Sequence, residues 1–173
     1  MRTLFEMDRQ PNVPHQGRLL CREAVRAVIL NGRKILLAYS QVHGDYKLPG
    51  GRIDPGENME SALARELSEE IGGRMISAAE PYGKTLEYDL PIEKEYDAFC
   101  VTSYYYCCEV DALLGEQRLD DYEARMGLKP MWVDIDKAIS ANREILATGG
   151  EVFCWVKRET RVLEMVRDEL LKQ

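Results

Sequence analysis

Residues 51–73 read GRIDPGENMESALARELSEEIGG and carry the most informative pattern in the chain. It begins with a glycine, and four of its five glutamates, namely Glu57, Glu66, Glu69 and Glu70, follow that glycine at informative offsets. We predict a helix over residues 58–71, with Asn58 as its N-cap and Gly72 as its C-terminal stop. Glu66 lies three and four positions before the last two glutamates, so all three carboxylates share one helix face.

This acidic face is unfavourable for a helix with a purely structural role. Like charges three or four residues apart repel one another by roughly 0.2–0.5 kcal/mol per pair. Glu69 and Glu70 also lie near the C-terminal end of the helix, where the helix dipole disfavours negative charge. A divalent cation would remove these penalties together, and clustered carboxylates suit Mg²⁺ first and Mn²⁺ next. The alternative is a solvated surface helix with salt bridges from Arg65 and Arg74, which we disfavour because several local rules are broken together.

Residues 51–73 resemble the Nudix box, whose family pattern is G-x5-E-x7-R-E-U-x-E-E-x-G-U with U an aliphatic residue. The matching positions are Gly51, Glu57, Arg65, Glu66, Leu67, Glu69, Glu70 and Gly72. The last position departs from the pattern, because Gly73 stands where an aliphatic residue is usual. The resemblance implies an α/β (α+β) fold, namely a Nudix-type α/β/α sandwich with a mixed central sheet. It places the box helix on one face and the C-terminal helix on the other.

The resemblance also implies the roles of the acidic residues. Glu66, Glu69 and Glu70 would hold the metal ion, and a backbone carbonyl of Gly50 or Gly51 would complete its ligand shell. The same carboxylates are the candidate catalytic groups. We favour Glu69 as the general base that takes a proton from the attacking water, although the family varies in this assignment.

Other residues around the box have candidate supporting roles. The resemblance implies that Glu57 supports the metal through water or other ligands, and that Arg65 pairs with a glutamate and holds it in place. The planar guanidinium suits this pairing better than a lysine would. The loop at 41–47 offers His43 and Tyr46 as candidates for the substrate side of the site, and an ordinary surface loop is an equal alternative.

The reaction implied by the resemblance is a Mg²⁺-dependent hydrolysis, with Mn²⁺ as a second choice of ion. A nucleoside diphosphate linked to another moiety would give a nucleoside monophosphate and a phosphorylated product. The sequence does not select among oxidised nucleoside triphosphates, nucleotide sugars, dinucleoside polyphosphates and capped RNA ends. One alternative is an inactive nucleotide-sensing module, which would be expected to lack box glutamates that are present here. A second alternative is an isomerase on the same scaffold, which would need additional His and Cys metal ligands or a catalytic cysteine. The two histidines of the chain have no matching spacing, which argues against it.

The composition is that of one soluble globular domain, predicted over residues 1–173. The net charge of −7 argues against general nucleic-acid or membrane binding and favours a small nucleotide-type substrate. Local basic residues or the metal must then offset the repulsion of a polyphosphate. No run approaches the ~20 apolar residues of a membrane span, and the start lacks a signal peptide. We therefore expect a cytoplasmic protein, and apolar strand edges are compatible with a homodimer.

The remaining sequence predicts the other elements. Residues 1–20 are expected to be an irregular lead-in with a short edge strand at 3–7. Apolar and β-branched runs predict strands at 23–30, 34–40, 96–110 and 128–133. Asn31-Gly32 predicts that the first two strands form the central hairpin of the sheet. Residues 74–90 mix strand signals around a turn expected at 81–83, and residues 111–125 are expected to form a loop. Helices are predicted at 136–147 and 153–171, the first with Asp134 or Asp136 as its cap and with a break at 149–150.

Three further sets of residues have open interpretations. Tyr104, Tyr105 and Tyr106 could stack on a base, but strand residues alternate faces, so packing is the stronger interpretation. By the resemblance, one acid of the 111–125 segment lends an extra carboxylate, the candidates being Glu116, Asp120, Asp121 and Glu123. The chain has five cysteines without a C-x-x-C spacing, which we expect to be reduced, with Cys100, Cys107 and Cys108 packed rather than reactive.

Overall fold

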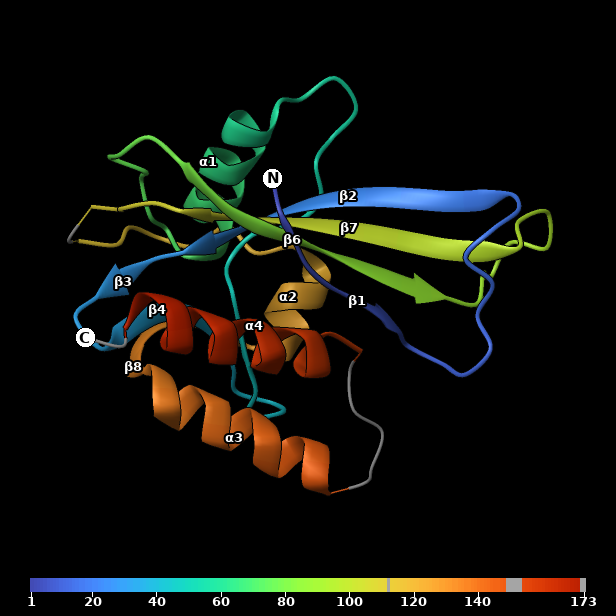
Figure 1. Ribbon diagram of the computed structural model, residues 1–173. Coiled ribbons are helices and arrows are strands. Elements are labelled where there is room, and N and C mark those ends of the chain that lie inside the picture. Colours follow the sequence, from blue (N-terminus) through green and yellow to red (C-terminus); the bar gives the residue numbers. More distant parts are fainter. Residues whose placement is uncertain (112, 149–153, 172–173) are drawn as a thin grey trace.

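The computed structural model describes residues 1–111, 113–148 and 154–171. Within these ranges, two four-stranded sheets lie between helices on opposite sides (Figure 1). Helix α1 (Met59–Glu70) covers one side of the strands. Helices α3 (Ile135–Ala147) and α4 (Cys154–Leu170) cover the other side. The predicted α/β class, with a mixed sheet and with the box helix opposite the C-terminal helix, is therefore confirmed.

The first sheet is mixed and has the strand order β1-β6-β7-β2. Its strands are β1 (Thr3–Asp8), β6 (Glu80–Asp89), β7 (Ala98–Cys107) and β2 (Leu19–Val28). The β1–β6 and β2–β7 pairs are parallel, whereas β6 and β7 are antiparallel. The edge strand predicted within the lead-in is confirmed as β1.

The second sheet is antiparallel and is built around β4 (Lys34–Ser40). Its other strands are β3 (Leu30–Asn31), β5 (Tyr46–Lys47) and β8 (Leu128–Asp134). The predicted central hairpin is correct only at its tip, where β3 pairs with the start of β4 around Gly32. The rest of the first strand belongs to the other sheet, because β2 pairs with β7 along its whole length.

Two other expectations about the chain are corrected. The turn predicted at 81–83 lies inside β6, where the register with β7 shifts between Pro81 and Gly83. A β-bulge of this kind accommodates both residues, and a Cβ at Gly83 would lie 2.4 Å from the Leu4 side chain of β1. The loop predicted at 111–125 contains a short helix, α2 (Asp121–Met126).

The helix ends follow the local sequence closely. The Asn58 side chain accepts a hydrogen bond from the Ser61 backbone N–H at 2.9 Å, and Gly72 ends α1 with a φ of 63°. Asp134 caps α3, as one of the two predicted caps. The predicted helix at 153–171 is confirmed as α4, while the predicted break at 149–150 lies outside the described residues.

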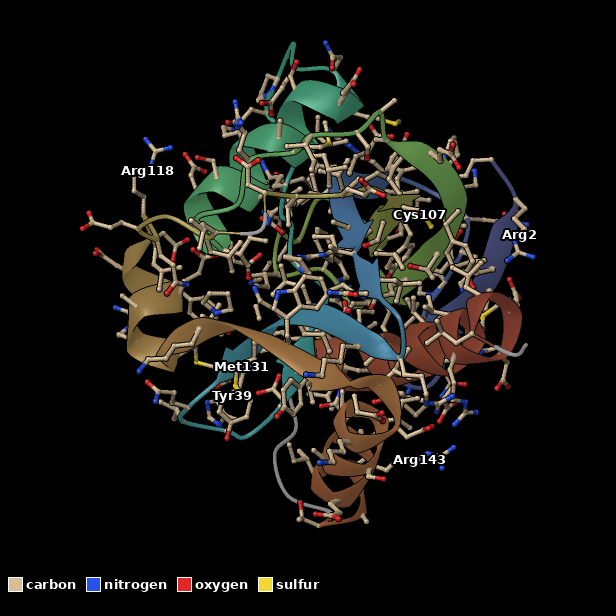
Figure 2. All side chains as sticks on the ribbon, turned by 90° about the vertical axis from the view of Figure 1, so that its left-hand side faces the viewer. Arg2, Tyr39, Cys107, Arg118, Met131 and Arg143 are labelled. Carbon is tan, nitrogen blue, oxygen red and sulfur yellow. The ribbon has the colours of Figure 1, made fainter. Side chains whose placement is uncertain are left out.

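The alternation of β2 and β4 side chains divides the core into two parts. Val25, Ala27 and Ile29 pack with Leu36 against α1, which contributes Leu63 among other residues. The intervening positions face α3 and α4, and they include Val28, Ile35 and Leu37. Figure 2, turned by 90°, shows the same layering, with α1 above the strands and α3 below them. Burial of apolar side chains on both sides therefore fixes α1 against the strands that lead into the box.

The five cysteines are all free, as predicted. Cys100 and Cys108 are buried, and burial raises the pKa of each thiol to about 12. The expectation that these thiols pack rather than react is consistent with such values, because the thiolate is the reactive form. In the described ranges there is no helix with the length and apolarity needed to span a membrane.

A buried charged network joins α4 to the first sheet and to the loop before the box. Arg158 is 3% exposed, and it pairs with Glu159 at 2.6 Å and with Glu87 of β6. Arg9 binds Glu87 from the other side at 3.2 Å. Glu159 in turn accepts a hydrogen bond from the Leu48 backbone N–H at 2.9 Å. Because each charge has a partner, the network can remain ionised while buried.

The Glu87 carboxylate gives this network a pH dependence. Burial raises the pKa of Glu87, but the Arg158 and Arg9 guanidiniums outweigh it, so the pKa lies below the ordinary 4.5. A carboxyl with a lowered folded pKa contributes stability that is present above the unfolded pKa and is lost as pH falls through the folded pKa. The contribution is thus complete at neutral pH and declines below about pH 4.5.

We expect Glu87→Gln to lower the free energy of unfolding by about 3 kcal/mol at pH 7, because it leaves a buried guanidinium short of a carboxylate. It should also weaken the loss of stability below pH 4.5, since the titrating group is gone. Urea denaturation at pH 7 and at acid pH measures both effects. Glu80→Gln, an exposed change on the same strand, is the control. Equal losses in the two variants would contradict the role of the network.

Candidate active site

Arg65 gathers the glutamates of the box around one guanidinium. Its Nε and Nη2 donate to the two carboxylate oxygens of Glu57 at 3.0 and 2.9 Å. Its Nη1 lies 2.8 Å from a Glu66 oxygen and 3.2 Å from a Glu69 oxygen. Nη2 also donates to the Arg52 carbonyl oxygen at 3.0 Å. The cation thereby offsets the repulsion among carboxylates that the helix spacing creates.

The electrostatic environment differs from one glutamate to the next. Hydrogen bonds from Arg65 lower the pKa of Glu57, and the same bonds raise the pKa of Arg65. Burial raises the pKa of Glu66, with Arg65 acting in the opposite direction. Glu70 adds to the increase at Glu66 through its charge. A cation placed near Glu66 and Glu70 would therefore stabilise both carboxylates in their ionised form.

Two glycines bring the backbone against Glu66 and Glu70. The Gly50 N–H donates to Oε2 of Glu70 at 2.7 Å. Gly50 has a φ of +132°, and a Cβ there would lie 2.2 Å from the Val25 carbonyl oxygen. At Gly51, a Cβ would lie 2.4 Å from the Glu66 carboxylate. Gly50 therefore requires glycine, whereas a side chain at Gly51 would displace the Glu66 carboxylate from its place beside the turn.

The buried Glu70 carboxylate has one oxygen without a hydrogen bond. Glu70 is fully buried, and Lys47 Nζ lies 2.7 Å from its Oε1 as an ion pair. This ion pair balances the carboxylate charge, while Oε1 has no hydrogen-bond partner. A buried carboxylate oxygen in this state is a suitable ligand for a hard cation.

The oxygen atoms of the box glutamates and of the glycine turn are chemically suitable ligands for a divalent cation. The carboxylates do not, however, surround a common point. Within the described ranges, no three His, Cys, Asp or Glu side chains are arranged around a common point for a metal. The carboxylates instead form ion pairs with Arg65 and Lys47. The carbonyl oxygens of Gly50 and Gly51 accept hydrogen bonds from the Arg26 guanidinium and the Val25 N–H respectively, which leaves each a second lone pair.

A cavity of about 390 Å³ opens beside Gly50, Gly51 and Glu66. Its lining carries basic side chains, namely Arg9, Arg26, Lys47, Arg52 and Arg158. On a chain with a net charge of −7, five basic side chains thus meet in one cavity, beside four acids that also line it, namely Asp45, Glu66, Asp120 and Glu123. Local basic residues of this kind are what a polyphosphate ligand requires on an acidic protein.

The lining of the cavity also contains aromatic and acidic side chains. Tyr122 and Trp155 meet edge to face, with ring centroids 6.3 Å apart and an interplanar angle of 89°. Asp120 and Glu123 also line the cavity. They form the capping box of α2, with Asp120 Oδ1 accepting from the Glu123 N–H at 2.7 Å. Burial raises the pKa of Glu123, and the Glu70 charge adds to the increase.

The residues predicted for the substrate side lie elsewhere. Tyr46 packs its ring on Tyr39, with centroids 4.8 Å apart, and its backbone N–H donates to Asn142 of α3 at 2.8 Å. Figure 2 shows Tyr39 on the side of the molecule away from α1. His43 donates its backbone N–H to Ser40 Oγ at 3.1 Å. Neither His43 nor Tyr46 is among the residues that line the cavity, and their substrate role stays a prediction.

The three consecutive tyrosines and the four candidate acids differ in whether they reach the cavity. Tyr105 is fully buried in the core, whereas the Tyr104 hydroxyl donates to Glu23 and the Tyr106 hydroxyl contacts the Met59 sulfur. The predicted alternation of the three rings is thus confirmed, and none of them lines the cavity. Of the four acids proposed for an extra carboxylate, Asp120 and Glu123 reach the cavity, and that catalytic role also stays a prediction.

Sequence reasoning missed helix α2 and several cavity residues, although some of these had a readable signal. Asp120 and Glu123 have the spacing of a capping box, which should have predicted α2. Arg158 and Glu159 lie within the apolar stripe of α4, and charges at such positions indicate a buried network. Asp45 and Trp155 offered no comparable pattern, because their proximity depends on tertiary structure.

Comparisons with known proteins agree with this architecture. The two sheets, the glycine turn and the acidic helix define the Nudix-type α/β class. The family model described as a NUDIX domain matches residues 21–156, which is more than half of the chain. The chain therefore belongs to the Nudix family. The match leaves a single domain over residues 1–173 as a prediction.

The curated relatives include proteins named RNA pyrophosphohydrolase. The one from a Nitratiruptor species is 30% identical over 117 residues, covering 59% of this chain and 76% of that one. The one from Campylobacter jejuni subsp. jejuni serotype O:23/36 (strain 81-176) is 37% identical over 76 residues, covering 40% and 49%. The nucleoside triphosphatase NudI of Enterobacter sp. (strain 638) is 50% identical over 40 residues, covering 22% and 28%. The chain thus spans about half the length of the Campylobacter relatives that it matches.

Solved structures share the fold at low identity. The E. coli ORF135 protein is 19% identical with a TM-score of 0.53, covering 88% of this chain and 95% of that one. A Nudix hydrolase from Nitrosomonas europaea is 20% identical with a TM-score of 0.52, covering 82% and 88%. These likenesses support the fold rather than a particular substrate.

The glycine turn can be tested through stability. We expect Gly50→Ala to lower the free energy of unfolding by about 2 kcal/mol more than Gly56→Ala, because overlap with the Val25 carbonyl adds to backbone strain. Gly56 also has a positive φ, of +83°, but a Cβ there meets open space. Its variant therefore reports the strain alone, about 1–2 kcal/mol. Chemical denaturation measures both, and equal losses would show that the close approach is unimportant.

Proposed function

We propose that this chain is a divalent-metal-dependent pyrophosphohydrolase acting on a nucleoside diphosphate linked to another moiety. One observation carries the proposal: the Glu66 and Glu70 carboxylates meet the Gly50–Gly51 turn beside a basic cavity. Acidic oxygens next to basic side chains suit a ligand that brings both phosphate and a cation. Membership in the Nudix family supports the same class of reaction.

Glu66, Glu69 and Glu70 are the proposed metal ligands, with the Gly51 carbonyl in support. Glu57 is placed further out, because both of its oxygens are engaged by Arg65. When bound, a divalent ion would neutralise phosphate charge and lower the pKa of a bound water. We propose Mg²⁺ as the ion, with Mn²⁺ as a substitute, because the donors are hard oxygens.

The chain's own groups would then bind and orient the substrate. Arg26 retains a buried Nε without a hydrogen-bond partner, which makes it available to a phosphate oxygen. Lys47 pairs with Glu70 and also lines the cavity, so its ammonium can move from the carboxylate to a phosphate. Glu69 has the side chain best exposed among the three proposed ligands, at 37%, and remains our choice of general base.

The substrate class follows from charge and from the relatives. Nucleoside polyphosphates match the basic cavity, either free or as the 5′ end of an RNA. The names RNA pyrophosphohydrolase and nucleoside triphosphatase among the relatives support these two forms. The net charge of −7 favours free nucleotides over long RNA, since an acidic surface repels a nucleic-acid backbone. A sensor without activity is disfavoured because all the box glutamates are retained.

We expect the wild-type protein to hydrolyse at least one compound in a Mg²⁺-containing screen of nucleoside triphosphates, nucleotide sugars, dinucleoside polyphosphates and 5′-triphosphate RNA. Glu69→Gln should lower kcat by about 100-fold or more, because general-base catalysis contributes on that scale. Glu66→Gln should instead raise the Mg²⁺ concentration needed for activity. Chromatography of the phosphate-containing products measures turnover and identifies the bond broken.

Glu60→Gln is the matched control, because it removes an exposed carboxylate from the first turn of the same helix. Its activity should equal that of the wild type. Unchanged activity in Glu69→Gln would refute the assigned base. Tight nucleotide binding without turnover of any compound would instead favour the sensor.

A further inference from the structure

The aromatic end of the cavity contains a buried carboxylate that the proposed reaction does not use. Asp45 lines the cavity but is only 2% exposed. Its Oδ2 accepts a hydrogen bond from Trp155 Nε1 at 2.8 Å, whereas its Oδ1 has no hydrogen-bond partner. Leaving a buried acceptor unsatisfied is costly, so an acid retained in this state calls for a function.

We propose that Asp45, Tyr122 and Trp155 form a nucleobase subsite that selects bases carrying an exocyclic amino group. The inference rests on the proposed function for the presence of a nucleotide, and it adds the class of base. Asp45 Oδ1 would accept the N–H of that amino group. A base with a carbonyl oxygen at the same position would place two acceptors against each other and bind less well.

The aromatic residues supply the apolar part of the subsite. Tyr122 and Trp155 meet edge to face, so their ring planes form a corner. A planar base can stack on one ring while its edge meets the second, in the arrangements that aromatic groups prefer. The basic residues line the same cavity, so one nucleotide can place its phosphates and its base within a single space of about 390 Å³.

The position of Asp45 is fixed by its neighbours rather than by the ligand. Its backbone carbonyl accepts a hydrogen bond from the Ser40 N–H at 2.9 Å. Ser40 Oγ in turn donates to the Met126 carbonyl of α2 at 3.2 Å. Trp155 holds one carboxylate oxygen, so the free oxygen has a defined orientation. An acceptor held in place before binding discriminates better than a mobile one.

The variant Asp45→Asn converts the acceptor into a donor without changing its size. Trp155 Nε1–H needs an acceptor, so the new amide oxygen should face Trp155. The amide NH₂ group then occupies the place of the free carboxylate oxygen. The substitution should therefore reverse the selectivity, favouring a base with a carbonyl oxygen over one with an amino group.

The test measures binding of nucleoside monophosphates by isothermal titration calorimetry, without a need for turnover. Adenosine and inosine monophosphates form one pair, and cytidine and uridine monophosphates form the other. In each pair an amino group is replaced by a carbonyl oxygen. The wild type should bind the amino member at least tenfold more tightly, and Asp45→Asn should bind the carbonyl member more tightly.

Asp8→Asn is the control, because it makes the same change of acid to amide at an exposed position of β1 that does not line the cavity. It should preserve the wild-type ratio. No discrimination by the wild type, no binding of any of the four compounds at millimolar concentration, or an unchanged ratio in Asp45→Asn would overturn the subsite.

The outcomes separate this inference from the proposed function. A reversed ratio in a protein without hydrolytic activity would retain the subsite and reject the pyrophosphohydrolase. Hydrolysis with equal binding of both members would retain the enzyme and reject the subsite.

Discussion

The ion pairs of Arg65 hold the candidate site together. Its guanidinium binds Glu57 through two hydrogen bonds and also contacts Glu66 and Glu69. Without this cation, several carboxylates would repel one another along a helix of 12 residues. Arg65 therefore allows α1 to carry acids that a cation can later share, and Lys47 has the same effect on Glu70.

In the fold, helix α1 packs against a turn formed by two glycines, which have no side chains. Gly50 and Gly51 fit between β2 and α1 because a side chain would overlap the Val25 carbonyl or the Glu66 carboxylate. The loop before them is held from the far side of the molecule, since Glu159 of α4 binds the Leu48 N–H. The cavity thus depends on contacts from both helical layers, which Figure 1 shows on opposite sides of the strands.

The sequence predicted the parts of the molecule that depend on local spacing. The box helix, its Asn58 cap and the Gly72 end are local features, and the structure reproduces them. The pairing of β2 with β7 was not predicted, because Asn31-Gly32 indicates a hairpin but cannot show that a distant strand offers a longer ladder. The wall of the cavity was missed for the same reason, because Asp45 and Trp155 meet across 110 positions of sequence. The metal-binding and catalytic roles of the box residues remain predictions, whereas the structure defines the positions of their side chains.

The position at which a divalent cation binds can be measured directly. Substoichiometric Mn²⁺ broadens the NMR signals of nearby amides, so a ¹⁵N spectrum maps the site without any need for a substrate. We expect the amides of Gly50, Gly51, Glu66 and Glu70 to broaden first, and Glu66→Gln to weaken the effect. Uniform broadening, or broadening centred on other acids such as Asp8 and Asp89 of the first sheet, would contradict a cation site at the box carboxylates.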